Sequence, residues 1–133
     1  MKKLLFLAML VSTFSLPAFS SDQVDPRIRC RSMPQGKEPG LFVNVFQKEN
    51  RFLAVFGEYW NKGHDVLATF RVRESRAPGV GAPLVYSTEG TDFKLSICDT
   101  CTPVDGMSPA VLDVRVNGYI VMGEEMLCKR AGI

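Results

Sequence analysis

The sequence predicts an all-β protein, specifically a small antiparallel barrel of seven to eight strands in meander order, with a β-sandwich as the alternative. Short segments that alternate apolar and polar residues recur at a spacing of roughly ten residues. Glycine or proline interrupts every long window that could otherwise form an amphipathic helix. Because consecutive hairpins give a meander that can close on itself, the barrel is favoured over the sandwich.

The N-terminal residues 1–20 have the pattern of a secretory signal peptide. Lys2 and Lys3 precede an apolar run, which is followed by a small-x-small cleavage site at residues 18–20. The run is too short to span a bilayer, and no cysteine stands at the cut to carry a lipid anchor. We expect a single all-β domain over residues 21–133, periplasmic or secreted, without membrane insertion after cleavage.

The charge of the mature chain argues against nucleic-acid binding. The whole chain has 16 Lys and Arg residues against 14 Asp and Glu residues. Loss of Lys2 and Lys3 with the signal peptide balances these numbers, because every acidic residue follows Ser20. A general nucleic-acid binder needs an excess of basic residues to neutralise phosphates.

The clearest hairpin lies between Arg51 and Arg73. Residues 61–63 (Asn-Lys-Gly) have the composition of a three-residue loop with glycine in the left-handed position. Counting outward from this loop places apolar residues opposite one another on one face: Phe56 with Ala68, Ala54 with Phe70, and Phe52 with Val72. The other face has the pairs Leu53 with Arg71, Val55 with Thr69, and Tyr59 with Asp65. A one-residue slip would reverse both faces, so this agreement supports the register.

Alternating patterns also predict the strands that precede this hairpin, and the second of them is strong. A first strand is expected over residues 27–32 and a second over residues 41–47. In the second strand, one face carries two phenylalanines and the other carries aliphatic residues: Phe42 and Phe46 against Leu41, Val43 and Val45. We assign the aliphatic residues to the outside of the barrel.

Two further hairpins follow. One turns at Glu89-Gly90, which would pair Tyr86 with Phe93 and Leu84 with Leu95. The other turns at Asn117-Gly118, the pair preferred where both residues need positive φ. It would pair Val116 with Tyr119 and Val114 with Val121, with a β-bulge at residues 123–125.

The cysteines predict two disulfides. An even number of cysteines in an exported chain is most simply read as a set of disulfides, and four cysteines allow three connectivities. Our first choice joins Cys30 to Cys128 and Cys98 to Cys101. Thiol–disulfide exchange at Cys98 and Cys101 is an alternative, but it favours a cysteine at a helix N-terminus, whereas these residues run from a strand into a loop. With a single CxxC, the sequence predicts no metal site.

No combination of residues indicates an enzyme, so we assign no catalytic residues and no cofactor. His64 is the only histidine and has no serine in a nucleophile motif to activate; it is expected to stack near Trp60. Glu124 and Glu125 are adjacent on a strand, so they point to opposite faces unless a bulge intervenes. Arg27, Arg29 and Arg31 share one face of the first strand and could form a basic surface that binds a carboxylate or a sugar acid.

The function predicted from these observations is non-enzymatic binding of a protein partner, or of a second copy of the chain. The predicted surface is an apolar face on the outside of the barrel: Val43, Val45, Leu53, Val55, Tyr59 and Leu67. An alternative is transport of a small apolar ligand inside the barrel, in a cavity lined by Phe42, Phe46, Phe70 and Phe93. A thiol–disulfide protein is the third alternative.

Overall fold

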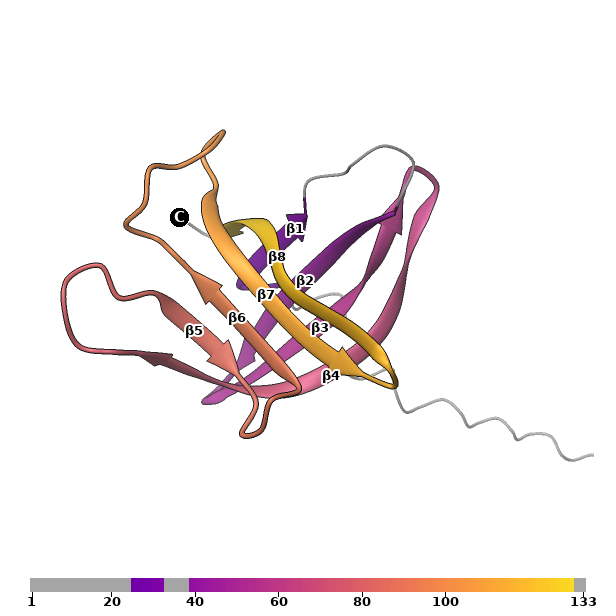
Figure 1. Ribbon diagram of the computed structural model, residues 1–133, viewed down its shortest axis with the longest axis horizontal. Coiled ribbons are helices and arrows are strands. Elements are labelled where there is room, and N and C mark those ends of the chain that lie inside the picture. Colours follow the sequence, from indigo (N-terminus) through magenta and orange to yellow (C-terminus); the bar gives the residue numbers. More distant parts are fainter. Residues whose placement is uncertain (1–24, 33–38, 131–133) are drawn as a thin grey trace, which may run out of the picture.

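The protein is a closed antiparallel barrel in which each strand pairs with the next and the last pairs with the first (Figure 1). A computed structural model describes residues 25–32 and 39–130, so the predicted signal peptide lies outside the described residues. The predicted all-β meander barrel is confirmed. Its strands are β1 (Ile28–Ser32), β2 (Gly40–Lys48), β3 (Arg51–Trp60), β4 (Gly63–Arg76), β5 (Leu84–Ser87), β6 (Phe93–Ile97), β7 (Ser108–Val116) and β8 (Tyr119–Arg130).

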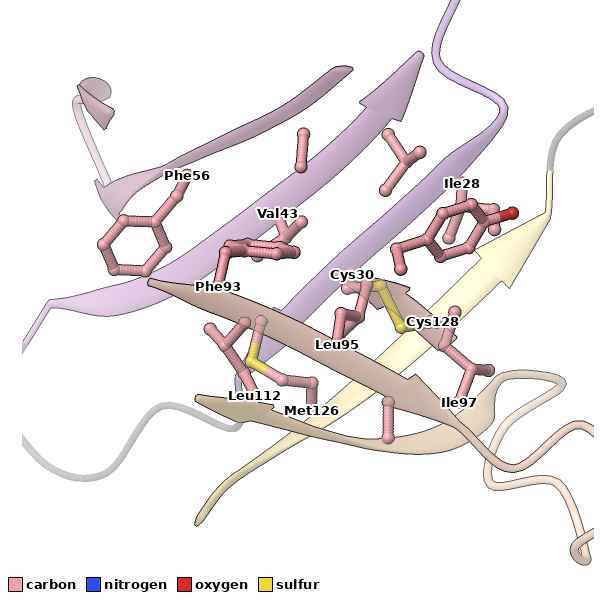
Figure 2. Close-up of a cluster of buried hydrophobic side chains, with 14 of the residues drawn as sticks. Ile28, Cys30, Val43, Phe56, Phe93, Leu95, Ile97, Leu112, Met126 and Cys128 are labelled. Atoms are coloured by element: carbon pink, nitrogen blue, oxygen red, sulfur yellow. A yellow bond between two sulfur atoms is a disulfide. The ribbon is translucent and has the colours of Figure 1, made fainter. Parts of the chain in front are cut away.

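Large apolar side chains fill the barrel. Figure 2 shows them packed around the disulfide between Cys30 and Cys128. The largest fully buried side chains are Tyr86, Phe56, Phe93, Ile28, Leu95, Leu112, Met126, Val43, Val45 and Val114. In an eight-stranded barrel the interior is just wide enough for side chains to fill, so this core occupies the space that an interior ligand would need.

The register predicted for the body of the β3–β4 hairpin is confirmed, but the predicted loop is wrong. Phe56 pairs with Ala68, and the pairs toward the open end of the hairpin follow as expected. Trp60, however, pairs with Gly63, which leaves a two-residue loop, and Gly63 does not have positive φ. A β-bulge that places Leu67 as an extra residue in β4 compensates for the shorter loop.

The face assigned to β2 is wrong. Val43 and Val45 are fully buried in the core, whereas Phe42 and Phe46 are only partly buried, on the opposite face. Val43 pairs with the inward-facing residues Cys30 and Phe56, and this pairing decides the direction of the whole strand. Two β2 phenylalanines of the proposed ligand cavity therefore lie outside the barrel. The alternation alone could not indicate which face is inward, because both faces are apolar.

The register predicted for β5 and β6 is also corrected. Tyr86 pairs with Leu95 and Leu84 with Ile97, a shift of two residues from the prediction. The connection is correspondingly longer than a Glu89-Gly90 turn, since the next strand begins at Phe93. A shift by an even number of residues leaves every side chain on the predicted face, so the core is unchanged.

The β7–β8 hairpin and both disulfides are confirmed. Val116 pairs with Tyr119 and Val114 with Val121, as the Asn117-Gly118 turn requires. A bulge interrupts the pairing between Leu112 and Val114. The resulting change of parity brings Cys128 directly opposite Cys30 on β1, and the two are bonded. The second disulfide joins Cys98 to Cys101.

Candidate functional site

The structure separates the residues predicted to form the partner surface. Val43 and Val45 belong to the core, so they cannot contact a partner. The others lie on the outside, opposite in direction to Ala54 and Phe56: Leu53, Val55, Tyr59 and Leu67. Sequence reasoning missed Phe42 and Val66, which lie beside them. We call Phe42, Leu53, Val55, Val66 and Leu67 the outer apolar face.

The β-bulge in β4 shapes this face. Val66 pairs with Gly57, and Leu67 is the extra residue before the regular pairing resumes at Ala68. Val66 is 54% exposed and Leu67 is 37% exposed. Val66 therefore faces a glycine, and the bulge adds Leu67 beside it as a second apolar side chain.

Gly57 leaves room for an aromatic side chain of the neighbouring strand β2. A Cβ atom at Gly57 would lie 2.7 Å from Cε1 of Phe42 and would also overlap the backbone oxygen of Asp65. The Phe42 ring therefore covers the glycine, and its edge-to-face contact with His64 has a centroid distance of 5.7 Å. His64 thus contacts Phe42 and pairs with Tyr59, and the expected stacking on Trp60 is not the arrangement observed.

Tyr59 ties three strands together at the edge of the face. Its ring lies over Gly40 of β2, where a side chain would overlap it. Its hydroxyl donates a hydrogen bond of 3.0 Å to the carbonyl oxygen of Ser32 at the end of β1. The Ser32 hydroxyl in turn accepts a hydrogen bond of 2.8 Å from the Leu41 backbone N–H. These contacts fix the positions of β1, β2 and β3 relative to one another.

A groove of about 700 Å³ adjoins the outer apolar face across β8, β1 and β2. Its basic side chains are Arg29, Arg31, Lys129 and Arg130, and its acidic one is Asp25. Its other lining residues include aromatic and polar groups: Phe42, Asn44, Tyr59 and His64. We call this the basic groove. Phe42, Tyr59 and His64 connect it to the outer apolar face. The predicted alignment of basic residues on one face of β1 is thus confirmed for Arg29 and Arg31.

A smaller pocket of about 520 Å³ lies at the end of the barrel near Cys98. Its lining is mostly apolar, with residues such as Pro83, Val104 and Val111. Glu125 contributes a carboxylate. The described residues that line it include no cluster of cationic or nucleophilic side chains, so it offers less chemistry than the basic groove.

The polar contacts at the open end of β4 are satisfied within the protein. The Tyr86 hydroxyl donates a hydrogen bond of 2.6 Å to Oε2 of Glu74, and burial together with this bond raises the pKa of Tyr86. Arg76 donates to both carboxylate oxygens of Asp99, and this hydrogen bonding lowers the pKa of Asp99. Because these polar side chains hydrogen-bond to one another, stabilisation of the fold accounts for them.

In the described part of the chain, the cysteines and acidic residues provide neither a free thiol nor a metal-binding group. Every cysteine is in a disulfide, and Cys98 stands just after β6 at the start of a loop. Within residues 25–32 and 39–130, no group of His, Cys, Asp and Glu could hold a metal ion. Glu125 pairs with Val111 and Glu124 with Leu112, which places the two acids at successive positions of β8.

Comparison of the chain with protein-family models, with curated proteins and with solved structures gives no match. Among the residues that the structure describes, no helix is long and apolar enough to cross a membrane. The two disulfides are typical of an oxidising, extracytoplasmic environment.

Proposed function

We propose that this is a non-enzymatic binding protein that engages a protein partner through the outer apolar face. The observation that carries the proposal is the exposure of Val66 and Leu67 side by side at the β4 bulge. Phe42 on β2 and the residues Leu53 and Val55 on β3 are partly buried, and they extend the apolar surface across neighbouring strands. Contiguous exposed apolar residues of this kind mark interaction sites in proteins.

The closed barrel determines how such a partner would bind. β1 pairs with both β2 and β8, so the eight described strands leave no free edge to which a partner could add a strand. Binding would therefore use side chains on the outer surface. The interior is occupied by Tyr86, Phe56 and Phe93, which favours the surface over the interior ligand site.

The proposed location follows from the disulfides and the N-terminal segment. The bonds Cys30–Cys128 and Cys98–Cys101 are stable in an oxidising compartment. Residues 1–20 have the sequence of a signal peptide. We place the mature protein in the periplasm or outside the cell, where it would meet an envelope or secreted protein, or a second copy of itself.

The double substitution Val66→Asp with Leu67→Asp tests the proposal. Both side chains are exposed, so the variant should keep the circular dichroism and thermal midpoint of the wild type. It should lose self-association in sedimentation velocity, or lose a cross-linked partner that the wild type retains from an envelope extract.

The matched control is Val111→Asp with Ile120→Asp, which makes the same change at residues that are 44% and 58% exposed on β7 and β8. This control should behave as the wild type. Equal loss of binding in both variants would indicate non-specific hydrophobic association rather than binding through the outer apolar face. A wild-type protein that neither self-associates nor retains a partner would contradict the proposal.

A further inference from the structure

The basic groove contains cations that lie close together on neighbouring strands. Arg29 of β1 is directly opposite Lys129 of β8, and Arg31 follows two residues later on the same face of β1. All three residues are exposed. The strand spacing separates the backbones of Arg29 and Lys129 by about 5 Å, and the rise along the strand separates Arg29 from Arg31 by about 7 Å.

Acidic side chains of the described residues form no ion pair with this array and offset its charge only in part. The ion pairs of residues 25–32 and 39–130 are Arg73–Glu89 and Arg76–Asp99, both outside the groove. Asp25 lines the groove, but it takes part in neither pair. The groove therefore presents a concentrated positive charge, although the mature chain as a whole is close to neutral.

Folding alone does not favour this arrangement. Like charges directly opposite each other on adjacent strands destabilise a sheet, whereas opposite charges stabilise it. The barrel uses the favourable arrangement elsewhere, since Lys94 on β6 faces Asp113 on β7. The pair of Arg29 and Lys129 is the unfavourable arrangement, and an anionic ligand between them would relieve it.

The neighbouring side chains add polar and apolar contacts to the charges. Two rows cross β8, β1 and β2 in register: Lys129–Arg29–Asn44 and Leu127–Arg31–Phe42. The first row offers cations and an amide, and the second places a cation between apolar groups. An anionic ligand with some apolar character fits this combination better than a free inorganic ion.

We propose that the basic groove binds an acidic, extended segment of the protein partner, in which carboxylates alternate with other residues. Alternate side chains of an extended chain are about 7 Å apart on one face, which matches the separation of Arg29 and Arg31. Arginine can bind a carboxylate through two parallel hydrogen bonds, which adds geometric selectivity. Phe42 belongs to both surfaces, so one partner could contact the outer apolar face and the groove together. This inference rests on the function proposed above.

The test uses a defined probe, a fluorescein-labelled peptide of alternating Glu and Ser residues, with the corresponding Gln–Ser peptide as the uncharged reference. Fluorescence anisotropy should show that the wild type binds the Glu peptide and not the Gln peptide. Binding should weaken as salt rises from about 50 mM to about 200 mM, because screening reduces interactions between exposed charges.

The decisive variant is Arg29→Ser with Lys129→Ser, which should bind the peptide about tenfold or more weakly because charge-assisted hydrogen bonds are lost. The control, Arg71→Ser with Arg115→Ser, removes the same charge from exposed positions outside the groove and should bind as the wild type. Circular dichroism verifies the fold, and Arg31→Ser provides a second variant if the first is unstable. Equal loss in both double variants, or no binding by the wild type, would overturn the proposal.

Two further measurements separate the groove from the outer apolar face and from other anions. The Val66→Asp with Leu67→Asp variant should still bind the Glu peptide, so a failure of the face and a failure of the groove give different results. Inorganic phosphate at millimolar concentration and a short single-stranded oligodeoxynucleotide should compete poorly with the peptide. Tighter binding of the oligonucleotide than of the peptide would count against a protein segment as the ligand.

Discussion

The hairpin of β3 and β4 and the hairpin of β7 and β8 are both long, and each contains a β-bulge, yet they are built in different ways. The β7–β8 turn has positive φ at both Asn117 and Gly118, so its residues match its geometry. The β3–β4 turn has two residues, Asn61 and Lys62, neither with positive φ. Gly63 occupies the first paired position of β4 instead of the left-handed position that its sequence suggests.

The two bulges also differ in how well the local sequence matches the backbone geometry. In β8 the bulge contains Gly123 with a φ of 68°, and the backbone N–H of Gly123 donates a hydrogen bond of 2.7 Å to Oδ1 of Asp113. In β4 the bulge falls at Val66 and Leu67, which carry no such conformational signal. A bulge can therefore be predicted from a sequence when a glycine and a hydrogen-bonding side chain form it, as in β8, but not when it lacks both, as in β4.

The difference extends to the surface of the barrel. Both hairpins expose apolar residues near their bulges, with Val66 and Leu67 on one and Ile120 and Met122 on the other. The β4 bulge lies next to Phe42, which connects it to the basic groove. The proposed binding surface is therefore assigned to the first hairpin.

The largest expected effect comes from the link between β8 of the second hairpin and β1. Replacing Cys30 and Cys128 by alanine opens a connection between residues 98 apart in the sequence. The chain-entropy treatment predicts a loss of about 5 kcal/mol in the free energy of unfolding. The same change at Cys98 and Cys101, which are 3 residues apart, should cost about 2 kcal/mol. Urea denaturation of both variants measures the difference, and equal losses would contradict this ranking.

The β4 bulge predicts a moderate effect at Phe70. The bulge shifts the pairing of β4 by one residue, so Phe70 faces inward opposite Ala54. The centroids of the Phe70 and Phe93 rings are 5.0 Å apart. Because Phe70 is only partly buried, Phe70→Ala should lower the free energy of unfolding by about 3 kcal/mol, at the low end for such changes. The exposed neighbour Arg71 should tolerate alanine to within about 0.5 kcal/mol. Similar denaturation midpoints for the two variants would show that the register is wrong.

The smallest expected change in stability comes from substituting the glycines near the two turns. Gly118 has a φ of 80°, so Gly118→Ala should destabilise the protein by about 1 kcal/mol because an L-residue is strained there. Gly63 lacks positive φ, and a methyl group added there would meet open space, so Gly63→Ala should be neutral or stabilising by about 0.4–1 kcal/mol. The midpoint of thermal unfolding should therefore fall for Gly118→Ala. For Gly63→Ala it should rise or stay unchanged. A larger loss at Gly63 would mean that the turn has the three-residue geometry.

The barrel class, the faces of most strands and the disulfide between Cys98 and Cys101 could be predicted because they depend on local patterns. Alternation with period two places Leu84, Tyr86 and Leu95 inward whatever the length of their loop. An even shift in register, such as the one between β5 and β6, leaves that result unchanged. Asn117-Gly118 likewise specifies its own turn, because few other pairs adopt positive φ at both positions.

The candidate site depended on contacts between strands that are distant in the sequence. Both faces of β2 are apolar, so only its pairing with Cys30 and Phe56 could show that Val43 is buried and that Phe42 lies outside. The basic groove required closure of the barrel, because β1 and β8 meet only when the first and last strands pair. Local patterns determine the alternation of each strand, whereas the direction of each face and the assembly of a site depend on the pairing of the whole sheet.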